Sequence, residues 1–108
     1  MTVFMVETYV VKPEKQTEFV AFGKKFDEWR KKNREKLKEV KSWRLFSQMF
    51  GGSFGGYVEV WEFENMAECE KCMNRVMQDK EFLTAIYLEF TSHIVPATHS
   101  INIWQSVP

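Results

Sequence analysis

The glycine-rich segment Gly51-Gly52-Ser53-Phe54-Gly55-Gly56 constrains the fold of this chain more than any other feature. It separates two strand-like stretches, residues 40–50 and 57–64, and therefore predicts a β-hairpin. A phosphate-binding loop would be followed by a helix N-terminus and usually a lysine, whereas a strand follows this one. We interpret its glycines as the residues that let the turn adopt positive φ angles.

The half of the chain before the hairpin predicts a strand and then a long helix. Residues 3–11 are rich in β-branched and aromatic side chains, and Pro13 ends this strand at a position suited to a first helical turn. The helix is indicated by four aromatic residues at the 3-4-3 spacing of one helical face. Asn33 interrupts that stripe, so we expect either a C-terminal cap or a kink there. The four aromatic residues are Phe19, Phe22, Phe26 and Trp29.

The half after the hairpin predicts a two-part helix and a last strand. Asn65, with Glu68 three residues later, resembles a capping box and indicates a helix start. The apolar stripe that follows breaks at residues 78–80, where Asp79 is a plausible new N-cap, and resumes until Pro96 ends the helix. Residues 100–107 predict the fourth strand.

The resulting order, β-α-β-β-α-β, predicts a ferredoxin-like fold of the α+β class: a four-stranded antiparallel sheet with two helices on one face. A chain of 108 residues makes this a single domain, residues 1–108. The net charge of zero gives no electrostatic case for binding nucleic acid or an anionic membrane. Residues 1–11 lack a basic leader, and no apolar run is long enough to span a bilayer, so we expect a cytoplasmic protein.

The strands have two chemically different faces, because side chains alternate along a strand. We expect an aliphatic face to pack against the helices and an aromatic face, mixed with ionisable groups, to point away from them. Four short strands present roughly 400 Å² per face, and an aromatic patch of that size is rarely left in water. We therefore predict a homodimer through this face, with a chamber between the two sheets. The aliphatic set is Phe4, Val6, Val58, Val60, Ile101 and Ile103, and the aromatic set is Glu7, Tyr9, Arg44, Phe46, Gln48, Glu59, Trp61, Phe63, Asn102 and Trp104.

The aromatic face also holds the candidate site. Glu59 is the candidate catalytic base, because a carboxylate buried beside aromatic rings has a raised pKa. Arg44 would neutralise Glu59 or hold an anionic ligand. The alternative is a purely structural Arg–Glu pair that fixes the register of the dimer. The expected ligand-binding residues are Glu7, Tyr9, Arg44, Phe46, Gln48, Trp61, Asn102 and Trp104.

The cysteines and histidines do not form a recognisable metal site. Cys69 and Cys72 share a helical face, but a structural zinc needs four ligands, and we interpret the two cysteines as core or boundary residues. His93 lies near a helix end and His99 just before the last strand, where capping of carbonyl groups is the simpler interpretation. We therefore expect no bound metal.

Beyond this pattern, the chain resembles a known superfamily. A strand ending in Trp-Glu-aromatic leads through a polar turn into a helix, in the run Val58-Glu59-Val60-Trp61-Glu62-Phe63-Glu64-Asn65-Met66-Ala67-Glu68. This run and the helix break at residues 78–82 resemble the dimeric α/β-barrel superfamily, first its NIPSNAP-like members and then its antibiotic-biosynthesis monooxygenase and haem-degrading group. The resemblance implies the same dimeric barrel, but the superfamily includes cofactor-free monooxygenases, isomerases, haem enzymes and members with no known activity.

The haem-degrading members use an asparagine on the first strand and a tryptophan and a histidine on the second helix. This chain has Val6, Glu7 and Thr8 on that strand and Ile86 or Tyr87 where the histidine would fall. We therefore expect no haem and no other cofactor. Two hypotheses remain. The first is a homodimer that binds a small, largely apolar molecule, with cofactor-free oxygenation or isomerisation as the implied chemistry. The second is a non-catalytic module whose aromatic face serves only assembly.

Overall fold

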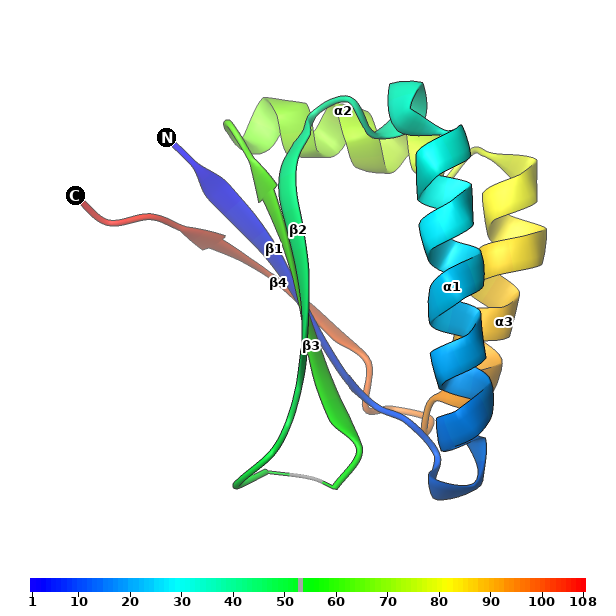
Figure 1. Cartoon of the computed structure of the whole chain (residues 1–108). Coiled ribbons are helices and arrows are strands. Elements are labelled where there is room, and N and C mark those ends of the chain that lie inside the picture. Colours follow the sequence, from blue (N-terminus) through cyan, green and yellow to red (C-terminus); the bar gives the residue numbers. More distant parts are fainter. Residues whose placement is uncertain (53) are drawn as a thin grey trace.

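The computed structural model describes residues 1–52 and 54–108. An antiparallel sheet in the order β2-β3-β1-β4 carries the helices on one face (Figure 1), so the predicted α+β, ferredoxin-like fold is confirmed. Among the described residues, no helix is long and apolar enough to cross a membrane. The strands are β1 Val3–Val10, β2 Val40–Ser47, β3 Gly56–Phe63 and β4 Ser100–Gln105, and the α-helices are α1 Gln16–Lys32, α2 Met66–Val76 and α3 Leu88–His93.

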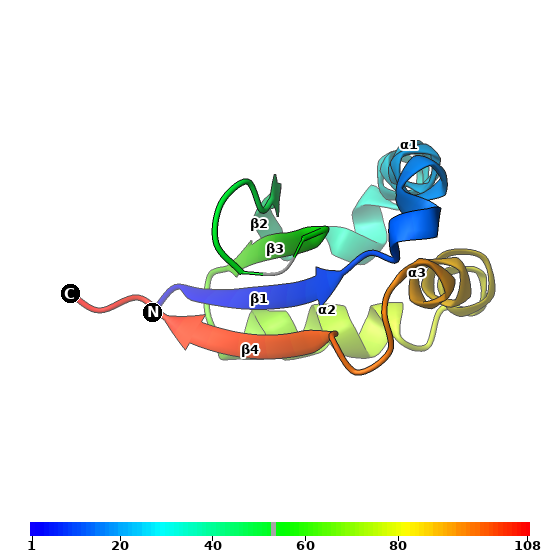
Figure 2. The same ribbon diagram turned by 90° about the horizontal axis from the view of Figure 1, so that it is seen from below.

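The helices enclose a space against the sheet rather than lying flat on it. Helices α1 and α3 stand side by side, joined by an ion pair between Lys25 Nζ and Glu89 Oε1 at 2.7 Å. Helix α2 crosses one end of the layer and contacts β1 and β3 (Figure 2). The sheet, the α1–α3 pair and α2 thus form three walls of one compartment.

Side-chain caps set the helix boundaries where the sequence placed them. Asn33 ends α1, donating from its backbone N–H (3.0 Å) and from Nδ2 (2.8 Å) to the carbonyl oxygen of Trp29. Asn65 begins α2, with Oδ1 accepting the N–H of Glu68 at 3.0 Å. Asp79 begins the next helical segment, with Oδ1 accepting a backbone N–H at 2.8 Å. The three caps predicted from the sequence are confirmed.

The segment after Asp79 differs from the expected α-helix, because Phe82–Tyr87 is π-helical before α3 begins. Phe82, Ile86 and Phe90 keep an ordinary helical spacing, so the apolar stripe gives no sign of this change. π-Helical turns are rare and often mark functional sites. This one faces the enclosed compartment.

The hairpin confirms the role of its glycines. Strand β2 ends at Ser47, three residues earlier than expected, and Gly51, Gly52 and Gly55 have φ angles of 71°, 58° and 80°. At Gly55 a side chain would also clash, because a Cβ atom there would lie 3.0 Å from the carbonyl oxygen of Val11. All three positions need glycine for conformation, and Gly55 also needs it for space.

The predicted assignment of faces was wrong for β1 and β3, which turn their aromatic sides to the helices, and it was correct for β2 and β4. Directly paired residues share a face, and the register pairs Met5 with Trp61 and Ile103, and Val6 with Val60 and Asn102. The helix-facing set is therefore Val3, Met5, Glu7, Tyr9, Trp43, Leu45, Tyr57, Glu59, Trp61, Phe63, Ile101 and Ile103. The outer set is Phe4, Val6, Thr8, Val10, Arg44, Phe46, Val58, Val60, Asn102 and Trp104.

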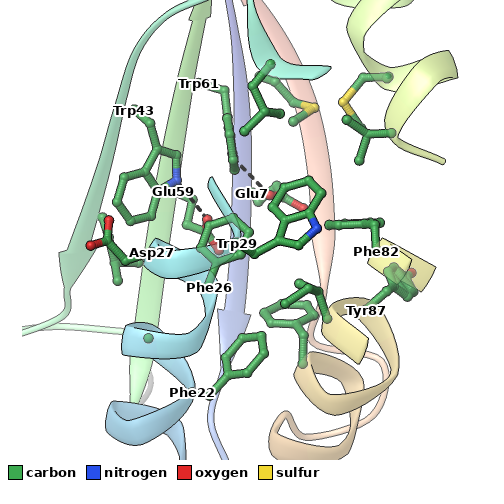
Figure 3. Close-up of a pocket in the computed structure, with 18 of the residues that line it drawn as sticks. Glu7, Phe22, Phe26, Asp27, Trp29, Trp43, Glu59, Trp61, Phe82 and Tyr87 are labelled. Atoms are coloured by element: carbon green, nitrogen blue, oxygen red, sulfur yellow. Dashed lines mark hydrogen bonds between the residues drawn. The ribbon is translucent and has the colours of Figure 1, made fainter. Parts of the chain in front are cut away.

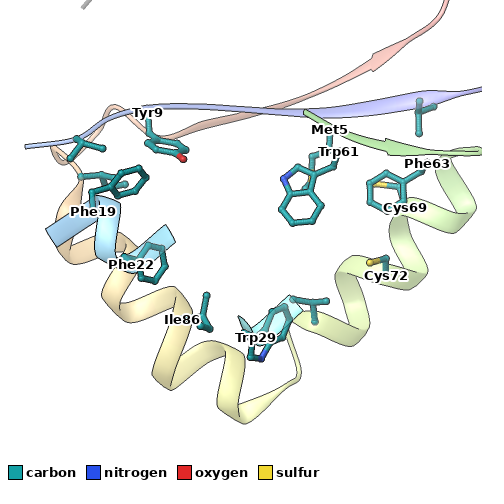
Figure 4. Close-up of a cluster of buried hydrophobic side chains, with 14 residues drawn as sticks. Met5, Tyr9, Phe19, Phe22, Trp29, Trp61, Phe63, Cys69, Cys72 and Ile86 are labelled. Atoms are coloured by element: carbon teal, nitrogen blue, oxygen red, sulfur yellow. The ribbon is translucent and has the colours of Figure 1, made fainter. Parts of the chain in front are cut away.

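The physical reason lies in the helices. The inner face of α1 is itself aromatic, and rings bury more apolar area than valines do. Phe19 and Phe22 therefore pack against aromatic residues of the sheet, with Phe19 and Tyr9 ring centroids 5.9 Å apart. Figure 4 shows Met5, Tyr9, Trp61 and Phe63 pointing from the sheet toward Phe19, Phe22, Trp29, Ile86, Cys69 and Cys72.

This assignment of faces predicts unequal costs for two identical substitutions. Phe63 is fully buried, so Phe63→Ala should lower the free energy of unfolding by about 3–5 kcal/mol. Phe54 is 88% exposed at the hairpin tip, so Phe54→Ala should cost less than about 0.5 kcal/mol. Urea denaturation of both variants measures the difference, and equal costs would contradict the burial of Phe63.

Candidate functional site

A cavity of about 350 Å³ lies between the sheet and the helices, within the size range of small-molecule sites. Figure 3 shows its sheet wall carrying Glu7, Trp43, Glu59 and Trp61 opposite rings from α1 and the π-helical segment. It reaches the surface beside Asp27 and Leu45, because both line it, Leu45 is exposed and the Asp27 side chain is half-exposed. Its aromatic lining is Tyr9, Phe19, Phe22, Phe26, Trp29, Trp43, Trp61, Phe63, Phe82, Tyr87 and Phe90.

Two carboxylates lie side by side on the sheet wall of this cavity. Glu7 of β1 pairs directly with Glu59 of β3, and the strand alternation aims both toward the helices. The ladder between the two central strands therefore fixes the distance and direction of both groups. Like charges directly opposite one another are unfavourable in a sheet, so this arrangement is costly for the fold.

Glu59 is buried, with 8% of its surface exposed, and it has only neutral hydrogen-bond donors. The Tyr9 hydroxyl donates to Oε2 at 2.7 Å and Trp43 Nε1 donates to Oε1 at 2.9 Å. Burial, followed by the charge of Glu7, raises the pKa of Glu59 to about 7, against the opposing effect of the two donors. At neutral pH this carboxyl group therefore exchanges protons readily, as a general base must.

Glu7 has a different set of partners. Trp61 Nε1 donates to Oε2 at 3.1 Å, and His99 Nε2 lies 3.0 Å from Oε1. An ionised carboxylate can only accept, so His99 donates, and this hydrogen bond raises the pKa of His99. Glu7 thus has a cationic partner when His99 is protonated. Among the described lining residues, no lysine or arginine stands beside Glu59.

The structure divides the predicted site residues into two groups. Glu7, Tyr9, Glu59 and Trp61 line the cavity. The others lie elsewhere. Arg44, Phe46, Asn102 and Trp104 are on the outer face of the sheet, and the Gln48 side chain folds back into the hairpin to donate to the carbonyl oxygen of Phe50.

The predicted pairing of Arg44 with Glu59 is wrong. Arg44 pairs with Val60 in the ladder, which places its side chain on the face opposite Glu59. Its guanidinium carbon lies 5.2 Å from the ring centroid of Phe46 on the same outer face. The cavity described here lies between the sheet and the helices within one chain, whereas the chamber expected between two sheets stays a prediction.

Sequence reasoning missed Trp43 and His99 as partners of the two carboxylates. Trp43 was assigned to the face opposite Glu59, and only the β2–β3 register shows that the two share a face. His99 was interpreted as a cap. It lies one residue beyond the paired stretch of β1 and β4, opposite Tyr9, which brings it to Glu7. A correct strand register would have found both.

The remaining sulfur and imidazole groups behave as structural residues. Cys69 and Cys72 are buried in the core, as interpreted from the sequence, and burial raises the pKa of Cys72 to about 11. Such thiols are unreactive at neutral pH. His93 is buried in the last turn of α3, with Nε2 3.4 Å from Glu89 Oε2. Cys72 also lines the cavity, but among the described residues none of these three groups hydrogen-bonds to Glu7 or Glu59.

Comparisons with known proteins show which proteins share the fold of this chain. No profile of a known family and no curated protein sequence matches the chain. Among solved structures, a NIPSNAP family protein from Agrobacterium tumefaciens aligns with a TM-score of 0.75 at 11% identity, covering 99% of this chain and 94% of that one. An uncharacterised NIPSNAP domain protein from Burkholderia xenovorans aligns with a TM-score of 0.69 at 15% identity, covering 99% of this chain and 95% of that one. An antibiotic biosynthesis monooxygenase aligns with a TM-score of 0.67 at 15% identity, covering 98% of this chain and 99% of that one.

These similarities confirm the resemblance at the level of fold. Identities of this size show a shared architecture over nearly the whole chain and leave the activity to be argued from the site. The chain has the fold of the NIPSNAP and antibiotic-biosynthesis monooxygenase proteins.

The buried carboxyl group predicts a specific pH dependence of stability. Because the pKa of Glu59 rises from 4.5 to about 7 on folding, the folded state binds the proton more tightly, and stability falls as pH rises between these values. Glu59→Gln keeps the shape and stays neutral. By urea denaturation it should be more stable than wild type at pH 8, by roughly 3 kcal/mol at most, with a much smaller gap at pH 5. A gap that does not change with pH would contradict the raised pKa.

Proposed function

We propose that the cavity binds a small, largely apolar molecule and that Glu59 removes a proton from it. The observation that carries this proposal is a buried carboxyl group with a pKa of about 7, aimed into an aromatic cavity without a cationic side chain beside it. A base with this pKa is matched to neutral pH, which is where proton transfer by a side chain is most effective. The apolar walls exclude water and strengthen electrostatic effects inside the site.

The chemistry follows from the two oxygens of Glu59. The proton of a C–H or O–H group moves to a carboxylate oxygen, and the electron pair stays on the ligand. Tyr9 and Trp43 hold the carboxylate in one orientation through their hydrogen bonds. Returning the proton to another atom of the ligand completes an isomerisation, whereas reaction of the carbanion with dioxygen begins a cofactor-free oxygenation. The shared fold with an antibiotic biosynthesis monooxygenase supports the second route.

A generic proton-abstraction substrate tests this proposal without knowledge of the natural ligand. 5-Nitrobenzisoxazole is neutral, flat and aromatic, and loss of its C–H proton opens the ring to a coloured phenolate. The wild-type rate should rise with pH around a midpoint near 7, because the base must be ionised. Glu59→Gln should lower this rate by about 100-fold or more, within the range of general-base contributions.

Glu70→Gln is the matched control, since Glu70 is exposed on α2 and the same substitution there should leave the rate unchanged. Equal rates in wild type and Glu59→Gln would remove Glu59 from the role of base. Circular dichroism of each variant checks that the fold is intact.

We also propose that a second copy of the chain covers the outer face of the sheet. This face is largely apolar, with Phe46 44% and Trp104 60% exposed, and the zero net charge gives no general repulsion between copies. A twofold axis would bring the same face against itself. The resemblance to dimeric α/β-barrel proteins supports this arrangement. If assembly were the sole role of the chain, dimerisation would persist with no proton-transfer activity.

Light scattering at micromolar concentration tests the dimer, for which the expected mass is twice 12.9 kDa. Trp104→Glu should shift the mass toward the monomer, because it places a charge in the proposed interface. Leu88→Glu is the control: Leu88 is 62% exposed on α3, away from the sheet, and its change should leave the mass unaltered. A wild-type monomer would end the dimer proposal and leave the cavity proposal standing.

A further inference from the structure

We propose that the cavity selects a hydrophobic monocation, an apolar molecule with one positively charged nitrogen that lies against Glu59. The inference rests on the proposed binding role of the cavity and does not require catalysis there. It names the charge of the ligand, which the apolar lining alone leaves open.

The charges that line the cavity all have the same sign. Glu7, Asp27 and Glu59 are acidic, and among the described lining residues none is a lysine, an arginine or a histidine. An anionic ligand would meet these acidic groups without a cationic side chain among the described lining residues to bind it. The site therefore discriminates against carboxylates and phosphates, and the choice is between a neutral molecule and a cation.

Glu59 alone among these acids lacks a counter-ion. Asp27 lies 3.0 Å from Lys31 Nζ and 3.6 Å from Arg30 Nη2 in its own helix. Glu7 has His99 at 3.0 Å. Glu59 receives only the neutral donors from Tyr9 and Trp43, although it is buried. A buried carboxylate is stable only when it is paired or protonated, and a ligand cation would supply the missing pair.

The aromatic walls favour the same charge. The face of an aromatic ring carries negative electrostatic potential and attracts ammonium and guanidinium groups. Trp43 already shows this property, because the guanidinium carbon of Arg30 lies 4.2 Å from its ring centroid. Trp61, Phe26 and Tyr87 add further rings around the cavity. An ammonium group among these rings would meet Glu59 on one side and apolar contacts elsewhere.

Binding of a cation must also move a proton. Near pH 7 the carboxyl group of Glu59 is partly protonated, and a cation beside it lowers its pKa, so binding releases protons. The groups that act on Glu59 are Glu7 and Tyr9 from β1, Trp43 from β2 and His99 before β4. The helix layer contributes Asp27, Cys72 and Tyr87 to the same cavity. A neutral ligand would bury the carboxyl group further, which raises its pKa, and would therefore release no protons.

The test compares three probes with the same apolar skeleton. 4-Phenylbutylamine is a cation at pH 7, 4-phenylbutanol is neutral and 4-phenylbutyrate is an anion. Quenching of the tryptophan fluorescence gives each dissociation constant, since Trp29, Trp43 and Trp61 line the cavity. We expect the amine to bind at least tenfold more tightly than the alcohol, and the carboxylate to bind least. Calorimetry in two buffers of different ionisation enthalpy should show proton release for the amine alone.

Two variants separate this inference from general binding. In Glu59→Gln the tenfold preference for the amine should fall below about threefold, with the alcohol affinity changed less than twofold. Glu70→Gln should behave as wild type. Tight binding of the alcohol without preference for the amine would overturn the cation inference and leave the apolar cavity in place. Failure of all three probes to bind would overturn both, and an amine preference that survives in Glu59→Gln would show that Glu59 is not the counter-ion.

Discussion

The packing of an aromatic sheet face against an aromatic helix stripe is the constraint on which the rest of this structure depends. Rings from β1 and β3 meet rings from α1, while α2 closes one end of the layer. Aromatic side chains are large and rigid, so they cannot fill an irregular space as completely as flexible aliphatic chains do. The cavity is the volume that these rings enclose without filling, and the π-helical turn at Phe82–Tyr87 forms part of its wall.

The same packing decides the chemistry of the carboxylates. Once the aromatic face turns inward, the ladder carries Glu7 and Glu59 inward with it. The two carboxylates differ in their partners. Glu7 lies beside His99, whereas Glu59 has no cationic partner and its pKa is raised. Replacing Glu59 by a neutral residue would raise the free energy of unfolding at neutral and higher pH. A costly group of this kind in a cavity is the pattern expected of a functional site.

Much of this could be predicted from the sequence. The element order, the caps at Asn33, Asn65 and Asp79 and the positive φ angles of the hairpin glycines all depend on local chemistry, which the sequence displays directly. Alternation also showed correctly that Glu7 and Tyr9 share one side of β1. The alternation of side chains does not show which side of a strand faces the helices. It also does not show that Ile101 of β4 pairs with Glu7 of β1. These depend on register and on competition between faces. In β1 and β3 the aliphatic side was wrongly expected to face the helices, although aromatic rings bury more apolar area.

The account has one central claim, that Glu59 is a buried carboxyl group poised to exchange a proton at neutral pH. Carbon-13 NMR titration of the glutamate carboxyl groups, with Glu59→Gln to assign the signal, measures this most directly. The account predicts that the signal lost in the variant titrates near pH 7 in the wild type. A midpoint close to the ordinary glutamate value of about 4.3 would contradict it, and the proposed base and the cation counter-ion would both lose their foundation.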